Sequence, residues 1–117
     1  MHDILLELNR EVGVQGILVV APDGVIIDAA LKVVLPQDLV AAVASEAVLN
    51  LKKKLQQLQI EKFSCFAIES SFGKIIFMDA GIAYLVAVLE KGINLDTTMI
   101  AIEGAVHRIK SAVQIKV

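Results

Sequence analysis

The side chains that could carry out chemistry are few and lie far apart in this sequence. Cys65 is the one cysteine, and the two histidines, His2 and His107, stand near opposite ends of the chain. Zinc sites need several Cys or His ligands at short, regular spacing, so we predict no metal site. A nucleophilic Cys65 with His107 as its base is an alternative, but a reactive thiol needs an electropositive site. A lone cysteine is more often a small buried hydrophobic residue.

The acidic residues show no catalytic arrangement. Asp23 lies in a predicted turn, where Asp bonds its own backbone, Asp79 precedes the turn at Gly81, and Asp28 lies near the end of a predicted strand. The sequence has neither a G-x-x-x-x-G-K-[ST] phosphate loop nor a G-x-G-x-x-G motif after a strand. We therefore predict that the protein is not an enzyme and needs no cofactor.

Composition predicts a folded chain with more aliphatic surface than it can bury alone. Of 117 residues, 56 % are hydrophobic and 21 % charged, and the net charge is −2. A mildly acidic balance does not favour nucleic-acid binding. The longest apolar run, residues 82–89, is far shorter than the ~20 residues of a membrane helix, and no secretory signal is recognisable. We expect a single cytoplasmic domain over residues 1–117, part of whose surface is covered by a partner.

The apolar periodicity predicts an α+β fold with the element order α-β-β-α-β-β-β-α. Helical spacing indicates helices over residues 3–12, 37–58 and 94–112. Apolar runs between turns indicate strands over residues 17–21, 25–30, 63–70, 75–79 and 82–89. The run 82–89 is apolar throughout, which favours the centre of a sheet with helices on both faces. We expect a five-stranded, mostly antiparallel sheet with residues 25–30 and 63–70 at its edges.

The predicted helix over residues 37–58 has two usable sides. Its apolar half is wider than the ~100° stripe of a one-sided helix. This half consists of Leu39, Val40, Val43, Ala44, Ala47, Val48, Leu51, Leu55 and Leu58. The other half begins with small residues at the spacing of a docking ridge and ends with lysines, which either oppose the helix dipole or attract an anionic partner. That half can contact a partner protein or the same helix of a second copy. Its candidate residues are Ala42, Ser45, Leu49, Lys52, Lys53 and Gln56.

The predicted edge strand over residues 63–70 would expose a long hydrophobic edge, which soluble monomers avoid. Alternation puts Phe66 and Ile68 on one face, and the other three apolar residues on the opposite face. Pairing with the same strand of a second copy, related by a two-fold axis, would cover both edges. We predict a homodimer whose interface includes Phe63, Cys65, Phe66, Ala67 and Ile68.

Particular segments add a family resemblance that covers nearly the whole chain. Residues 13–20 (Gly-Val-Gln-Gly-Ile-Leu-Val-Val), the turn at 22–27, the Ala-rich helix 41–58, the segment 73–77, the strand 82–89 and the helix 95–109 resemble the Roadblock family of dynein light-chain type. The family's frequent Leu-Gly before the last helix is replaced here by Gly-Ile-Asn-Leu at 92–95.

The resemblance implies a Roadblock/profilin-like fold and a non-enzymatic module that dimerises through the first strand of the meander and the long helix. It further implies a scaffold or regulator of Ras-like small GTPases, or a cargo-side subunit of motor complexes. Two other functions are open from the residues alone. One is a small-molecule sensor of PAS or GAF type, which needs a cavity with convergent polar groups. The other is a purely structural subunit of a larger complex.

Overall fold

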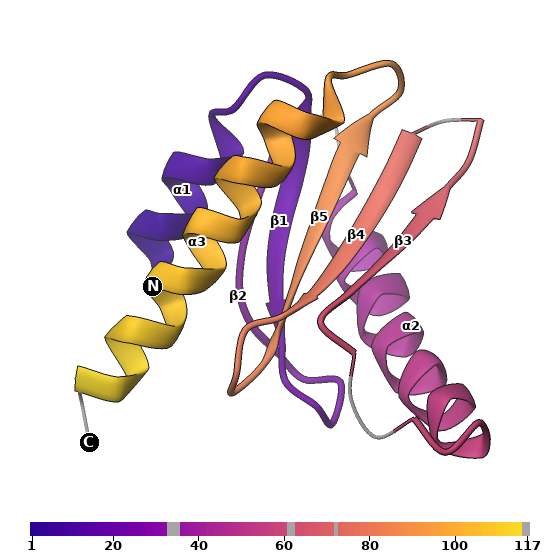
Figure 1. The fold of residues 1–117 in the computed structure, drawn as a ribbon. Coiled ribbons are helices and arrows are strands. Elements are labelled where there is room, and N and C mark those ends of the chain that lie inside the picture. Colours follow the sequence, from indigo (N-terminus) through magenta and orange to yellow (C-terminus); the bar gives the residue numbers. More distant parts are fainter. Residues whose placement is uncertain (33–35, 61–62, 72, 116–117) are drawn as a thin grey trace.

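The computed structural model describes residues 1–32, 36–60, 63–71 and 73–115. Within these ranges the elements follow the predicted order (Figure 1). They are α1 (His2–Asn9), β1 (Val14–Val20), β2 (Ile26–Leu31), α2 (Gln37–Gln57), β3 (Cys65–Glu69), β4 (Gly73–Asp79), β5 (Tyr84–Glu90) and α3 (Leu95–Ile115).

The strands form one sheet in the order β2-β1-β5-β4-β3, and each described pairing of neighbours is antiparallel. The predictions that β5 is central and that β2 and β3 are edges are confirmed. The predicted start of β5 at Ile82 is wrong. Gly81 has φ +90°, and the backbone N–H of Ala80 bonds the carbonyl of Ala83 at 2.8 Å. This tight turn occupies residues 80–83, so the strand begins at Tyr84.

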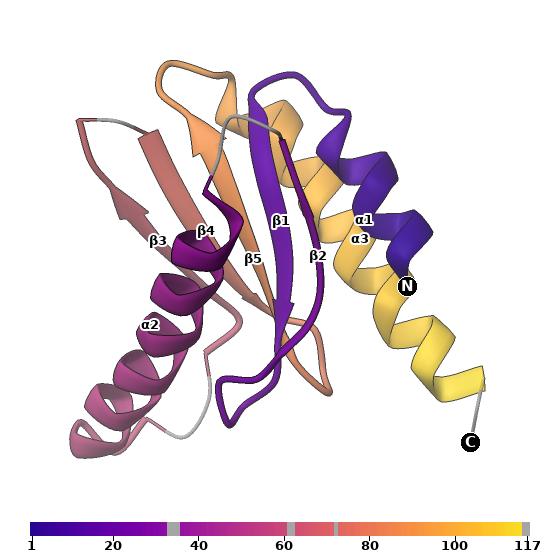
Figure 2. The same ribbon diagram turned by 180° about the vertical axis from the view of Figure 1, so that it is seen from behind.

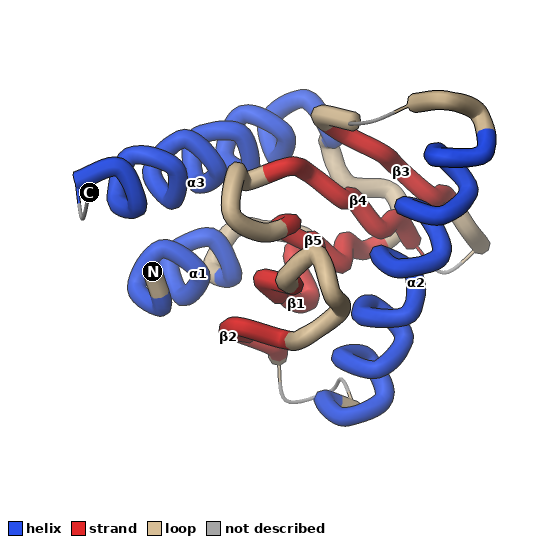
Figure 3. Tube along the Cα trace, turned by 90° about the horizontal axis from the view of Figure 1, so that it is seen from below, coloured by secondary structure: helices blue, strands red, loops and turns tan. Residues whose placement is uncertain are grey.

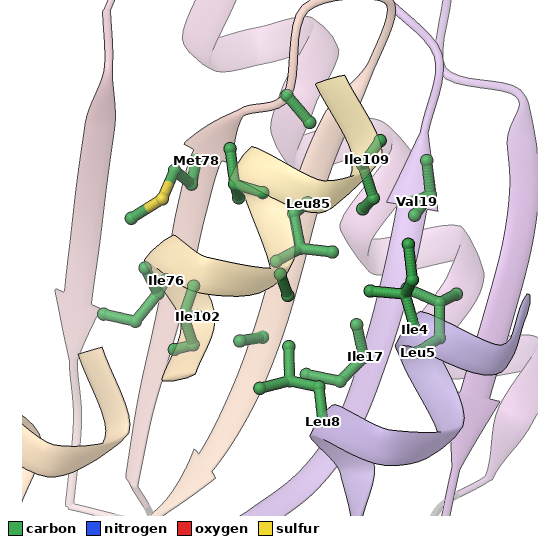
Figure 4. Close-up of a cluster of buried hydrophobic side chains, with 14 of the residues drawn as sticks. Ile4, Leu5, Leu8, Ile17, Val19, Ile76, Met78, Leu85, Ile102 and Ile109 are labelled. Carbon is green, nitrogen blue, oxygen red and sulfur yellow. The ribbon is translucent and has the colours of Figure 1, made fainter. Parts of the chain in front are cut away.

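Helices cover both faces of the sheet, as the sequence predicts. α1 and α3 lie side by side on one face, and α2 lies on the other (Figures 2 and 3). The face under α1 and α3 carries the larger buried cluster, in which Leu5, Ile102 and Ile109 pack over Ile17 and Leu85 (Figure 4). Each fully buried aliphatic side chain contributes roughly 1.5–3 kcal/mol, so this layer is the main source of stability.

Asn94 begins α3 by capping it. Its side-chain Oδ1 accepts a hydrogen bond from the backbone N–H of Asp96 at 3.1 Å, and the buried Thr98 donates its hydroxyl to the Asn94 carbonyl at 3.1 Å. Asx side chains at this position satisfy N–H groups that the first helical turn leaves unpaired. Among the described residues, no helix is long and apolar enough to cross a membrane.

Candidate partner interface

β3 is the uncovered edge of the sheet. All five of its residues are exposed, and in the part of the chain that the structure describes it pairs with β4 alone. Phe66 lies opposite Phe77 and Ile68 opposite Ile75, and directly opposed residues in an antiparallel pair share a face. Phe66 and Ile68 therefore lie on the α2 face, while Cys65 and Ala67 lie on the α3 face. The alternation predicted for residues 65–68 is confirmed.

The face predicted for Phe63 is wrong. Phe63 precedes β3, so the strand's alternation does not extend to it. Its ring instead joins the cluster under α2. It stacks on Tyr84 with ring centroids 5.2 Å apart and meets Phe66 edge-on at 6.4 Å. Such aromatic contacts fix ring geometry as well as burying area, so Phe63 anchors the segment that leads into β3.

An apolar groove separates α2 from the β3 edge. Its volume is about 310 Å³. We call it the α2 groove, and define it by its lining residues: Leu39, Val40, Val43, Ala44 and Ala47 of α2, with Ile68, Ile75, Phe77, Val86 and Val88 of the sheet. Within α2, Leu39 is 62 % and Val43 51 % exposed. Exposed large apolar side chains that cluster beside an open strand are typical of a protein interface.

The groove exists because α2 buries only part of its broad apolar half. Ala44 and Val48 are buried, whereas Leu39, Val43 and Leu58 from the same predicted half are exposed. The core needs only a narrow stripe of a helix. Leu39 and Val43 were absent from the predicted site, although the unusual width of the apolar half was the signal that could have identified them.

The predicted ridge on the other side of α2 is divided by the β1–β2 turn. Ser45 donates its hydroxyl to the Gly24 carbonyl, and a Cβ at Gly24 would lie 2.9 Å from Leu49 Cδ1. Lys52 is half-buried and lines a small cavity with Phe63. Four members of the predicted set are exposed: Ala42, Leu49, Lys53 and Gln56. Of these, Leu49 borders the β1–β2 turn. The structure thus places the β3 residues and the predicted helix ridge on opposite flanks of α2.

The three aspartates considered above have structural roles, as predicted. Asp23 accepts a hydrogen bond from the backbone N–H of Val25 at 3.2 Å, and Asp79 accepts one from that of Gly81 at 2.8 Å. Both bonds hold turns. Asp28 lies 2.9 Å from His2 Nδ1 and so joins β2 to the start of α1.

Cys65 is exposed, so the expectation of a small buried hydrophobic residue is wrong. It lines a second cavity of about 300 Å³ between β3, β4 and α3, together with Glu103, His107 and Lys110. Partial burial, and then the negative charge of Glu103, raise the pKa of the Cys65 thiol. A raised pKa lowers the fraction of reactive thiolate at neutral pH, which is the opposite of what a nucleophile needs. Within the described ranges, no group of three or more His, Cys, Asp or Glu side chains could hold a metal ion.

Residues 2–90 match the family model of the Roadblock/LC7 domain, and the chain belongs to this family. The family is generally a non-enzymatic adaptor or regulator fold. An uncharacterized protein of Methanocaldococcus jannaschii, MJ0714, is 33 % identical over 108 residues, which cover 92 % of each chain.

Two solved structures share the fold. Myxococcus xanthus MglB has a TM-score of 0.83 at 13 % identity, with 97 % of this chain and 94 % of that chain covered. A Roadblock/LC7 domain from Streptomyces avermitilis has a TM-score of 0.78 at 13 % identity, with 97 % and 98 % covered. The predicted family and fold are therefore confirmed.

Proposed function

We propose that this protein is a homodimeric adaptor or regulator of a Ras-like small GTPase and acts in the cytoplasm. The observation that supports the dimer best is the fully exposed β3 beside the α2 groove. The family supports the adaptor class. The absence of polar side chains from the described groove lining argues against a small-molecule sensor, because such a site needs a few polar groups to orient its ligand.

In the proposed dimer, β3 pairs with β3 of a second copy and extends the sheet across a two-fold axis. The pairing satisfies the backbone groups of the open edge. It also brings Ile68, Leu39 and Val43 of one copy against the same apolar side chains of the other. An isologous interface of this kind repeats each contact twice, so a modest patch supplies enough buried apolar area for a stable pair.

The dimer is tested by a matched pair of substitutions on the two edge strands. Ile68 on β3 and Ile27 on β2 are each 46 % exposed. Ile68→Lys should abolish the β3 pairing and lower the mass because it places a charge in the apolar contact, whereas Ile27→Lys should leave the mass unchanged. Light scattering at tens of micromolar measures both. A wild-type protein that scatters as a monomer contradicts the proposed dimer.

We assign the GTPase contact to the accessible strip of α2, which consists of Ala42, Lys53 and Gln56. Small residues allow close approach of a partner, and lysine speeds the arrival of an acidic surface. None of these three residues lines the α2 groove or belongs to β3, so one dimer can present two copies of the strip while its β3 edges are paired.

The partner is tested by isolating the tagged dimer from its native cells. A captured protein supports the proposal if its sequence carries a G-x-x-x-x-G-K-[ST] loop and it brings guanine nucleotide with it. Lys53→Glu should then weaken capture while the dimer stays intact. Lys91→Glu, the same charge change on an exposed loop distant from α2, should not. Equal capture by both variants contradicts the assigned strip, and a captured complex without a GTPase favours the purely structural subunit.

A further inference from the structure

The outer side of α3 carries a large apolar residue with no contact to explain it. Ile100 is 72 % exposed, while the opposite side of the helix, with Ile102 and Ile109, is completely buried. α3 lies beside α1 in the outer layer on its side of the sheet (Figures 1 and 3). We use the name α3 seam for the exposed residues at spacings of three, four and three: Thr97, Ile100, Gly104 and His107.

Gly104 borders a cavity between α1 and α3, but no close contact there requires a glycine. A Cβ built at this position meets nothing within 4 Å, and its φ is not in the left-handed region. Glycine in a helix interior is less stable than alanine, so the fold itself gains nothing from it. The missing side chain leaves the backbone of α3 open to close approach from outside, one helical turn from the exposed Ile100.

These two residues are complementary when the seam meets itself. In an antiparallel pair of α3 helices centred at Ile102, Ile100 of each copy lies at the height of Gly104 of the other. The projecting side chain of one copy thus faces the gap left by glycine in its neighbour. Both contacts form together, because a two-fold axis relates them.

The charges along α3 select the antiparallel orientation. The acidic Asp96 lies in the first turn, and the exposed, basic Lys110 lies in the C-terminal half. Arg108 is already paired with Glu7 of α1 at 3.0 Å. Antiparallel packing brings each acidic end beside a basic end. It also places the positive end of each helix dipole beside the negative end of the other, which is favourable. A parallel pair would put like charges together. Glu103 lies near the centre in both orientations and does not discriminate between them.

We propose that the α3 seam binds the α3 seam of a second copy in antiparallel orientation. The seam lies on the face of the sheet opposite α2 and contains no residue of β3. Its centre at Ile100 and Gly104 is separate from the β3 edge, although His107 lines a cavity with Cys65 of β3. Each copy therefore has a second surface for self-association. A protein that uses both surfaces assembles beyond a dimer.

Gly104→Leu tests the steric contact. The new side chain meets nothing within the fold at its Cβ and leucine is a better helix former, so the variant should fold well. It should weaken the α3 association at least about tenfold, which is a loss of ~1.4 kcal/mol. Gly104→Ala is the matched control, because it changes helix propensity in the same direction but adds only one methyl group, and it should associate more tightly than the leucine variant.

Sedimentation over a range of concentrations, with and without Ile68→Lys, separates the two interfaces. We expect the wild type to exceed a dimer and Gly104→Leu to fall back to one. We expect Ile68→Lys alone to leave an α3-linked dimer, and the double variant to be a monomer. A wild-type mass that Ile68→Lys leaves unchanged but Gly104→Leu lowers would overturn the proposed β3 dimer and support the seam. Identical masses for wild type and Gly104→Leu at every concentration would overturn the seam.

A charge exchange tests the orientation. Lys110→Glu should weaken the association because it faces the acidic end of the other helix, and adding Asp96→Lys should restore it. Both positions are exposed, so neither change disturbs the core. If the double variant associates no better than Lys110→Glu alone, the antiparallel assignment is wrong.

Discussion

α2 is held to the sheet by few buried side chains. Truncating one buried valine on α2 and one on β1 compares how tightly the two layers are packed. Val48 of α2 and Val19 of β1 are both buried, so a change to alanine removes the same two methyl groups from each. They belong to different clusters: Val48 packs in the smaller one under α2, and Val19 in the larger one under α1 and α3.

The expected losses differ because their surroundings differ. Two methyl groups contribute roughly 1.6 kcal/mol of burial at either position. In α2, alanine is the better helix former and offsets up to about 0.7 kcal/mol of the loss. The adjoining α2 groove also allows the helix to move into the vacated space. In β1, alanine is the poorer strand residue by up to about 1 kcal/mol, and packed helices leave a cavity. We expect unfolding free energies to fall by about 1 kcal/mol for Val48→Ala and about 3 kcal/mol for Val19→Ala.

Urea unfolding followed by circular dichroism measures both variants. Ile68→Lys and Gly104→Leu are both included in each, so that neither proposed association contributes to the unfolding free energy. Equal losses, or a larger loss for Val48→Ala, would refute the inference that α2 is the more loosely packed layer.

Three further predictions follow from single positions. Gly104→Ala should stabilise the fold by about 0.5–1 kcal/mol, seen as a raised melting temperature in a background where α3 association is blocked by Lys110→Glu. Gly24→Ala should lower the unfolding free energy by about 1–3 kcal/mol, because φ is +90° there and Leu49 leaves no room for a Cβ; unchanged stability would contradict the contact. Cys65→Ala should change stability by less than about 1 kcal/mol because the residue is exposed, and partner binding should persist. Since the pKa of its thiol is raised, the rate of Cys65 labelling should increase with pH to a midpoint above that of free cysteine.

The sheet could be predicted from the sequence because its signals are local. The fully apolar run that includes residues 84–89 could only be buried on both faces, which located the centre of the sheet. Turns rich in Gly and Pro located the hairpins. The errors lie at the ends of elements, where a single backbone hydrogen bond can decide where a strand begins. The hydrogen bond between Ala80 and Ala83 closes a turn and shortens β5. β3 begins only at Cys65, so the side chain of Phe63 does not follow the alternation of the strand and lies on the other face.

The candidate site was only partly predictable because it depends on how elements meet. The uncovered edge at Ile68 followed from the hydrophobic pattern. The sequence pattern could not show which flank of α2 borders the groove, because this depends on the position of α2 over the sheet. A helical wheel cannot show that Leu39 lies beside the open strand or that Ser45 is bonded to the β1–β2 turn. Likewise, Gly104 is informative only once its empty surroundings are known.

The two edges of the sheet differ in a way that limits polymerisation. β2 has a register shift opposite the β1 pair Val19 and Val20, and its Asp28 carboxylate lies in hydrogen-bond contact with His2 of α1. Bulges and charges of this kind prevent the addition of further strands, whereas β3 has a regular register with β4. In the proposed dimer, strand addition uses the β3 edge of both copies and leaves only the two protected β2 edges. Growth along the sheet therefore ends at two copies, and the chain avoids the open-ended strand stacking that produces fibrils.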